Sequence, residues 1–252
     1  MQKLIQTLCL KAYRAAATSR LSNTDIGKRL FVSVYDFYKE HFEAKAAEEL
    51  RAWTRLGTTV IDVGANMGFF TVRFARWVGP TGRVIAIEPE AENLRLLRHR
   101  LERSGLAANV EVIEGVAAEE PGMLRLAINR FHPADHRIGK EGQPVRAWAI
   151  DELVAARGWP AISLIKIDVQ GAEVRVLRGA RATIARFHPR LLVEVDDRAL
   201  EEAGFSADLL FDEIERHGYR PYDPADPSIP LSRSKAALRR RALGYADYLF
   251  GA

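Results

Sequence analysis

The stretch that decides the fold is Val60-Ile61-Asp62-Val63-Gly64-Ala65-Asn66-Met67-Gly68-Phe69-Phe70, which is typical of a buried strand that enters a glycine turn and then a helix. Gly64 and Gly68 allow the backbone to approach a ligand closely, and the start of the helix offers unpaired N–H groups. A second apolar segment, Arg83 to Ile87, ends in Glu88. An acid at this distance from the glycine turn is placed to accept hydrogen bonds from both hydroxyls of a ribose. The pattern therefore predicts a site for a nucleotide-like ligand.

Asn66 distinguishes between two classes of such ligands. It stands where the dinucleotide fingerprint G-x-G-x-x-G has its second glycine. That glycine lets the backbone approach a pyrophosphate, so a side chain there argues against NAD. The turn favours a smaller ligand such as S-adenosylmethionine (SAM).

From Gly57 onward the chain alternates short apolar runs with longer amphipathic stretches. This alternation predicts a parallel sheet covered by helices on both faces. Helices are expected over Phe69 to Trp77 and Glu92 to Ser104, each followed by a glycine, and residues 129–144 are expected to form an active-site loop. The expected strands are Thr59 to Val63, Arg83 to Glu88, Asn109 to Glu114, Met123 to Ile128, Val145 to Ala149, Leu164 to Val169, Arg190 to Val195, Tyr219 to Tyr222 and Ala246 to Phe250. Residues 1–56 carry apolar positions near a 3.6-residue period and are predicted to form an N-terminal helical cap before the domain at 57–252.

Composition narrows the class of protein. The chain has 252 residues, of which 48% are hydrophobic and 28% charged, and these values exclude disordered, collagen-like and disulfide-scaffold proteins. The single cysteine, Cys9, allows no internal disulfide and predicts a cytoplasmic location, and no apolar run is long enough to span a membrane. The net charge of +4 comes mostly from the two ends of the chain. These basic ends are interpreted as solvated faces, with peripheral membrane contact as the alternative, and no nucleic-acid partner is expected.

Three spaced motifs together resemble the FkbM family of SAM-dependent methyltransferases. They are Asp62 to Gly68, Glu88-Pro89, and Leu164 to Glu173 with Val176 to Ala180, and the resemblance covers about residues 57–197. It implies a class I methyltransferase fold, which is a Rossmann-like, mostly parallel seven-stranded sheet. It also implies O-methylation of a hydroxyl on a sugar, glycan or secondary metabolite. Gln170 departs from the family, which usually has glutamate there, and is interpreted as a neutral surface substitution.

The resemblance also implies which residues hold the cofactor. The turn after the first strand would surround the methionine portion of SAM, Glu88 would hold the ribose, and the end of the third strand would contact the adenine. The residues assigned to SAM, or to its product S-adenosylhomocysteine (SAH), are Asp62, Gly64, Ala65, Asn66, Gly68, Glu88, Glu114 and Val116. Glu114 has an alternative interpretation as an exposed acid at a strand end.

A second cluster of charged residues follows the apolar strand at 164–169. Asp168 is the leading functional carboxylate because ligands of open α/β sheets lie beyond the carboxyl ends of the strands; its alternative role is a helix N-cap. Glu173 and Glu194 are predicted to orient substrate hydroxyls or the base. Lys166 is costly to bury unpaired, which predicts an ion pair with Glu194 or Asp168. Asp168 and Glu194 are too few for a confident divalent-cation site, so a cation is left open and no metal ligand is assigned.

His136 is the second candidate base, because Asp135 precedes it in a loop expected to overhang the same edge of the sheet. His132 and His136 have the spacing of a helical metal pair, but Pro133 argues against a helix through both. The catalytic set is therefore Asp168, His136, Glu173 and Glu194.

Two other functions remain open at this point. A nicotinamide-dependent oxidoreductase also needs a glycine turn and an acid after the second strand, but Asn66 and the lack of a Tyr-x-x-x-Lys motif argue against it. A SAM-binding module without catalysis is the other alternative. The sequence fixes neither the acceptor nor the oligomeric state.

Overall fold

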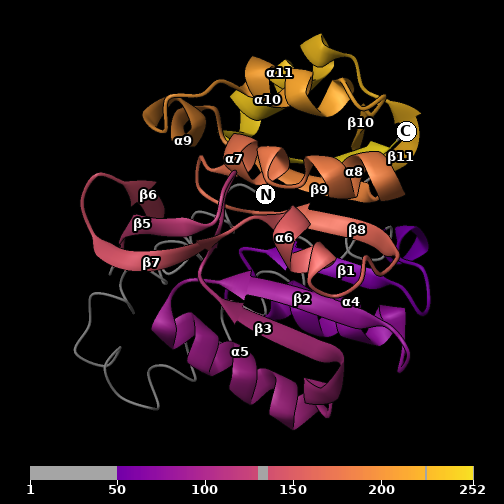
Figure 1. Cartoon of the computed structure of the whole chain (residues 1–252). Helices are drawn as coiled ribbons and strands as arrows, with labels where there is room; N and C mark the ends of the chain where they lie inside the picture. Colours follow the sequence, from indigo (N-terminus) through magenta and orange to yellow (C-terminus); the bar gives the residue numbers. More distant parts are fainter. Residues whose placement is uncertain (1–49, 130–135, 225, 252) are drawn as a thin grey trace, which may run out of the picture.

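The computed structural model of the chain describes residues 50–129, 136–224 and 226–251 (Figure 1). The helical cap expected over residues 1–56 lies outside this range except for its end, where residues 50–53 are helical. The domain boundary expected at residue 57 therefore stays a prediction.

The main sheet has eight strands in the order β11-β10-β12-β9-β8-β1-β2-β3. Five of them are parallel: β1 (Thr59–Val63), β2 (Arg83–Glu88), β3 (Val110–Glu114), β8 (Ile162–Ile167) and β9 (Arg190–Val195). The strands β12 (Ala246–Gly251), β10 (Arg220–Asp223) and β11 (Asp226–Pro230) continue the sheet with antiparallel pairings. The fold is thus Rossmann-like with a mixed sheet, and the expected count of seven strands is wrong.

One strand of the main sheet, β11, lies in a segment for which the sequence predicted no strand. Residues 221–230 are rich in proline and aspartate, which are depleted in strands, yet β10 and β11 pair as a hairpin at the edge of the sheet. Pro227 and Pro230 lie in β11, and this edge strand tolerates proline because its outer N–H groups face no partner.

Helices cover both faces of the sheet, as the hydrophobic pattern predicts. Val60 packs in one cluster with Phe74 of α4 (Phe69–Val78), whereas its neighbour Ile61 packs in another cluster with residues of α6, α7, α8 and α10. The remaining helices are α5 (Ala91–Ser104), α6 (Ile150–Ala155), α7 (Glu173–Arg178), α8 (Arg181–Phe187), α9 (Asp197–Glu202), α10 (Ala207–Glu215) and α11 (Arg233–Leu243). All residues of β1 and β8 are buried, as a central strand with two covered faces requires.

A second, four-stranded sheet lies beside the main one (Figure 1). Its strands are β4 (Val116–Ala117), β5 (Gly122–Ala127), β6 (Arg137–Gly139) and β7 (Gln143–Trp148), in the order β4-β7-β5-β6. The expected loop at residues 129–144 therefore contains a strand, because β6 pairs with β5. This sheet leaves the main sheet at the carboxyl end of β3, since β4 begins two residues beyond it.

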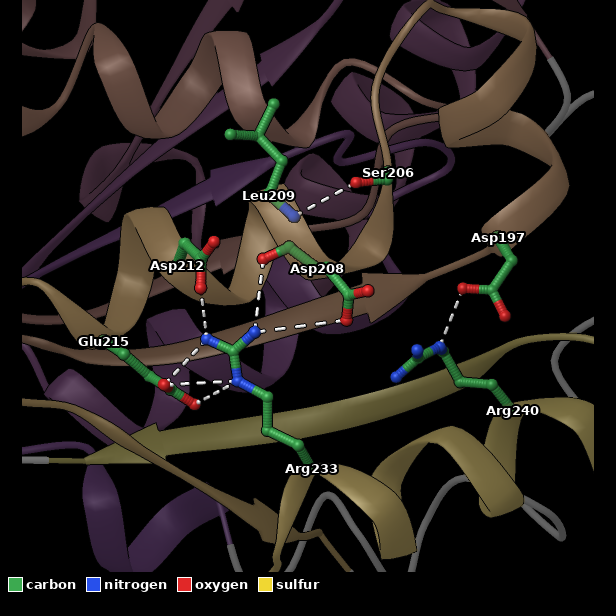
Figure 2. Close-up of polar contacts among 8 residues, drawn as sticks. All are labelled: Asp197, Ser206, Asp208, Leu209, Asp212, Glu215, Arg233 and Arg240. Carbon is green, nitrogen blue, oxygen red and sulfur yellow. Dashed lines mark hydrogen bonds and ion pairs between the residues drawn. The ribbon is translucent and has the colours of Figure 1, made fainter.

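Three of the basic residues near the C-terminus pair with acids of the same chain. Arg233 donates hydrogen bonds to Asp212 and Glu215 of α10, and Arg240 donates to Asp197 at the start of α9 (Figure 2). Arg239 pairs with Asp223 of β10. These pairs fasten α11 to the helices beside it. No helix among the described residues has the length and apolar character that crossing a membrane requires.

Candidate active site

The site lies where the order of the parallel strands reverses. From β1 the chain proceeds to β2 and β3 on one side, and from β8 it proceeds to β9 on the other. Ligands of open α/β sheets bind beyond the carboxyl ends of the strands at such a point. The backbone N–H of Asp168 donates to the carbonyl of Val63 at 3.1 Å, which joins the ends of β8 and β1. The structure therefore brings the glycine turn after β1 and the segment after β8 together at one edge.

The glycines of the turn pack against the protein itself. Gly64 has φ of +76°, and a Cβ there would lie 2.0 Å from the carbonyl oxygen of Asp168. Gly68 has φ of +83°, and a Cβ there would lie 2.4 Å from Leu97 Cδ1 of α5. The sequence interpretation gave these glycines the role of bringing the backbone close to a ligand. The structure shows instead that they admit a left-handed backbone and close contact with β8 and α5.

Glu88 is a buried carboxylate held by the segments on either side of it. Its Oε2 accepts from the backbone N–H of Asn66 at 2.8 Å, and its Oε1 accepts from the N–H of Glu90 and from Asn93 Nδ2 at 3.0 and 3.1 Å. Burial is the main reason that the pKa of Glu88 rises to about 7. A carboxylate oxygen accepts two hydrogen bonds, so Oε2 retains one acceptor position for a hydroxyl of a ligand. The residues present therefore fit the ribose of SAM.

Asp62, Lys166 and Asp168 form a buried charged cluster beneath the turn. Asp62 and Lys166 are direct neighbours in the pairing of β1 with β8. Lys166 Nζ lies 2.8 Å from Asp168 Oδ2 and 3.8 Å from Asp62 Oδ1, and Thr71 Oγ1 donates to Asp62 Oδ2 at 2.6 Å. The predicted ion pair of Lys166 with Asp168 is confirmed. Asp62 is fully buried, and its predicted contact with the methionine portion of SAM stays a prediction.

Glu173 lies at the start of α7, close to Asp168. Its Oε1 accepts from the N–H of Gly171 at 3.1 Å, and its Oε2 has no hydrogen-bond partner in the described part of the chain. Burial, together with the charges of Asp168 and Asp196, raises the pKa of Glu173 to about 8. The N-cap of α7 is Ala172, so the alternative role of Asp168 as a helix cap is wrong.

The other predicted carboxylates have different surroundings. Glu194 Oε2 accepts from Gln170 Nε2 at 3.0 Å. Gln170 is half-buried and bonded, which corrects its interpretation as a surface substitution. Glu114 has a side chain 69% exposed, 3.9 Å from Arg98, whereas Val116 packs in the core of the small sheet.

His136 directly precedes β6. Its Nδ1 accepts from the backbone N–H of Asn129 at 3.2 Å, so a neutral His136 carries its proton on Nε2. The adjacent Arg137 forms an ion pair with Glu202 of α9, which ties the small sheet to the segment after β9. His132 and Asp135 lie outside the described residues. Within the described ranges, no group of three or more His, Cys, Asp or Glu residues could hold a metal ion.

Sequence reasoning missed Thr71 and Asn93, which hold Asp62 and Glu88 in place. Both are buried polar residues near the start of a helix that directly follows a strand. The signal available in the sequence was a polar residue at a helix position that was expected to face the sheet.

Comparisons with known proteins agree with this architecture. A family model described as the methyltransferase FkbM domain matches residues 62–221. The chain is 28% identical to the 31-O-demethyl-FK506 methyltransferase FkbM of Streptomyces tacrolimicus, over 82% of this chain and 90% of that protein. It is 30% identical to the AMB antimetabolite synthetase AmbE of Pseudomonas aeruginosa, over 64% of this chain and 9% of that much longer protein.

Among solved structures, the methyltransferase FkbM of Methylobacillus flagellatus shares the fold, with a TM-score of 0.50 and 17% identity over 98% of this chain. This chain spans 59% of the length of that structure. The match to the family model covers more than half of the residues, including the turn after β1 and the segment after β8. The chain belongs to the FkbM family of SAM-dependent methyltransferases.

Proposed function

We propose that this protein transfers the methyl group of SAM to a hydroxyl oxygen of a small-molecule or glycan acceptor in the cytoplasm. The observation that carries the proposal is the pair of carboxylates at the switch point, with Glu88 offering an acceptor position and Asp168 partly exposed beside it. Support for oxygen as the methylated atom comes from the relative whose name describes a 31-O-demethyl-FK506 methyltransferase.

Each residue of the site has a separate role in the proposed reaction. SAM, when bound, supplies an electrophilic methyl group on a sulfonium that leaves as a neutral thioether. Asp168, paired with Lys166, takes the proton of the acceptor hydroxyl as the oxygen forms its bond to the methyl carbon. Glu88 binds the ribose, and the turn after β1 fixes the direction of attack.

Glu173 and His136 are better suited to donate hydrogen bonds than to accept the proton. Glu173 holds its proton at neutral pH, because burial raises its pKa to about 8. A neutral His136 carries its proton on Nε2, since Nδ1 accepts from Asn129. We therefore assign Asp168 as the base, with Glu173, Glu194 and His136 orienting the acceptor.

Calorimetric titration with SAH and with NAD tests the cofactor. Binding of SAH and none of NAD is expected, whereas tight binding of NAD without a response to SAH would end the methyltransferase assignment. Incubation with labelled SAM and matched hydroxyl and amine acceptors then tests the atom that is methylated. Once an acceptor is known, Asp168→Asn should lower kcat by about 100-fold or more, and Glu173→Gln should lower it much less.

A further inference from the structure

Lys166 places a buried positive charge between the two carboxylates at the carboxyl ends of β1 and β8. Its side chain is 4% exposed, Asp62 is 0% exposed, and Asp168 is 28% exposed. The ammonium also lies 5.2 Å from the centre of the Phe70 ring, at the start of α4. The lysine therefore contacts both motifs that border the switch point.

Stability alone is a weak reason for a lysine at this position. Its neighbours in β8, Ile165 and Ile167, are fully buried and aliphatic. An apolar side chain of similar volume is often as stabilising as a buried ion pair, provided that the carboxylates are replaced as well. The ammonium of Lys166 offsets part of the negative charge that the two carboxylates bring to this position.

We propose that Lys166 is an electrostatic positioning residue that sets how strongly the SAM site prefers a positive charge at the reacting centre. This inference rests on the proposed function. Asp62 and Asp168 favour a cationic centre, and Lys166 offsets part of that preference. The reacting sulfur changes from a cation to a neutral thioether during transfer. The carboxylates therefore stabilise the starting state more than the later states, and the positive charge of Lys166 reduces this difference.

The size of the effect follows from Coulomb's law. A unit charge within about 8 Å of a ligand charge, at an effective dielectric constant of about 20 to 30, changes the relative affinity for charged and neutral ligands by about tenfold or more. Substitutions that change packing alone alter the affinity for both ligands together. The ratio of two affinities therefore separates the charge of Lys166 from its contribution to the fold.

Two SAM analogues supply the measurement without an acceptor. Sinefungin carries an ammonium where SAM carries its sulfonium, and SAH carries a neutral thioether. Calorimetry at pH 7.5 and low salt gives the dissociation constant of each for the wild type and its variants. We expect Lys166→Met to raise the preference for sinefungin over SAH by about tenfold, and the control Lys166→Arg to keep it within about threefold.

Lys166→Gln removes the charge with a polar side chain in its place, and it replaces Lys166→Met where that variant fails to fold. Asp168→Asn gives an independent test that leaves Lys166 paired with Asp62. It removes a negative charge, so the preference for sinefungin should fall by about tenfold. If the wild type binds both ligands and neither variant changes the ratio, the inference is overturned while the proposed function stands. If the wild type binds neither, the proposed function fails, and the inference fails with it.

Discussion

Two clusters in this molecule surround a single cation with carboxylates, and they differ mainly in burial. Lys166 lies among central strands with a 4% exposed side chain and pairs with Asp62 and Asp168. Arg233 is 37% exposed and reaches Asp208, Asp212 and Glu215 of α10 (Figure 2). Each ion pair of the arginine is open to water and to screening by salt.

The difference shows that the number of ion pairs is a poor guide to their role. The Arg233 cluster fastens one surface helix to another, and its pairs contribute little each. The Lys166 cluster lies at the switch point of the sheet, where a charge left without its partner is costly and where a ligand is expected. Burial and position in the sheet, rather than the count of contacts, mark the functional cluster.

The largest expected effect comes from removing each cation in turn. Lys166→Met removes the positive charge beside the buried carboxylate of Asp62 and should lower the free energy of unfolding by about 3 to 5 kcal/mol. Arg233→Met should lower it by about 1 kcal/mol, and less in 1 M salt. Urea denaturation measures both, and equal losses would contradict the distinction drawn between the two clusters.

The pH dependence of stability tests a further buried residue of the site, Glu173. The pKa of Glu173 is raised to about 8 from its ordinary value of 4.5, so its stabilising contribution is present below pH 4.5 and is lost as the pH rises through 8. Relative to wild type, Glu173→Gln should therefore gain stability from pH 5 to pH 9, by up to roughly 4 kcal/mol. Denaturation at each pH measures it, and a difference that stays constant with pH would show that Glu173 is not protonated in the fold.

Glu88 and Glu92 form a matched pair for ligand binding, one buried at the site and one exposed on α5. Glu88→Ala should weaken SAH binding by about 10- to 100-fold, because hydrogen bonds to a charged group contribute about 1.5 to 3 kcal/mol. Glu92 pairs with the neighbouring Arg95 in solvent, and Glu92→Ala should leave the affinity within about threefold. Similar losses in both variants, measured by calorimetry, would remove Glu88 from the site.

The smallest expected effect is that of Gln170→Glu, which restores the residue usual in the family. Gln170 donates to Glu194, so the variant places two carboxylates about 3 Å apart. We expect a loss of about 1 kcal/mol in the free energy of unfolding at pH 8, measured by urea denaturation, because like charges repel each other. A variant as stable as wild type would show that the two side chains move apart.

The sequence predicted the parallel half of the fold well because those strands carry unmistakable local signals. β1, β2, α4 and α5 lie within a residue or so of their expected bounds, since continuous apolar runs and terminal glycines mark them. β6 and β11 were missed because they are short and polar and form only through pairing with β5 and β10. Such strands depend on contacts between distant residues, which local composition does not report.

The same limit applies to the site. Asp168 beside Lys166 could be predicted, because a lysine among aliphatic strand residues needs a partner. The bonds of Thr71 to Asp62 and of Asn93 to Glu88 could not, because they depend on how α4 and α5 pack on the sheet. The roles of Asp168, Glu173, Glu194 and His136 stay predictions.

A crystal structure of the SAH complex tests the central claim most directly. The account predicts a ribose hydroxyl within hydrogen-bonding distance of Glu88 Oε2, and the sulfur beyond the carboxyl ends of β1 and β8, on the side of Asp168. SAH bound elsewhere, or bound with Glu88 contacting only Asn66, Glu90 and Asn93, would contradict it.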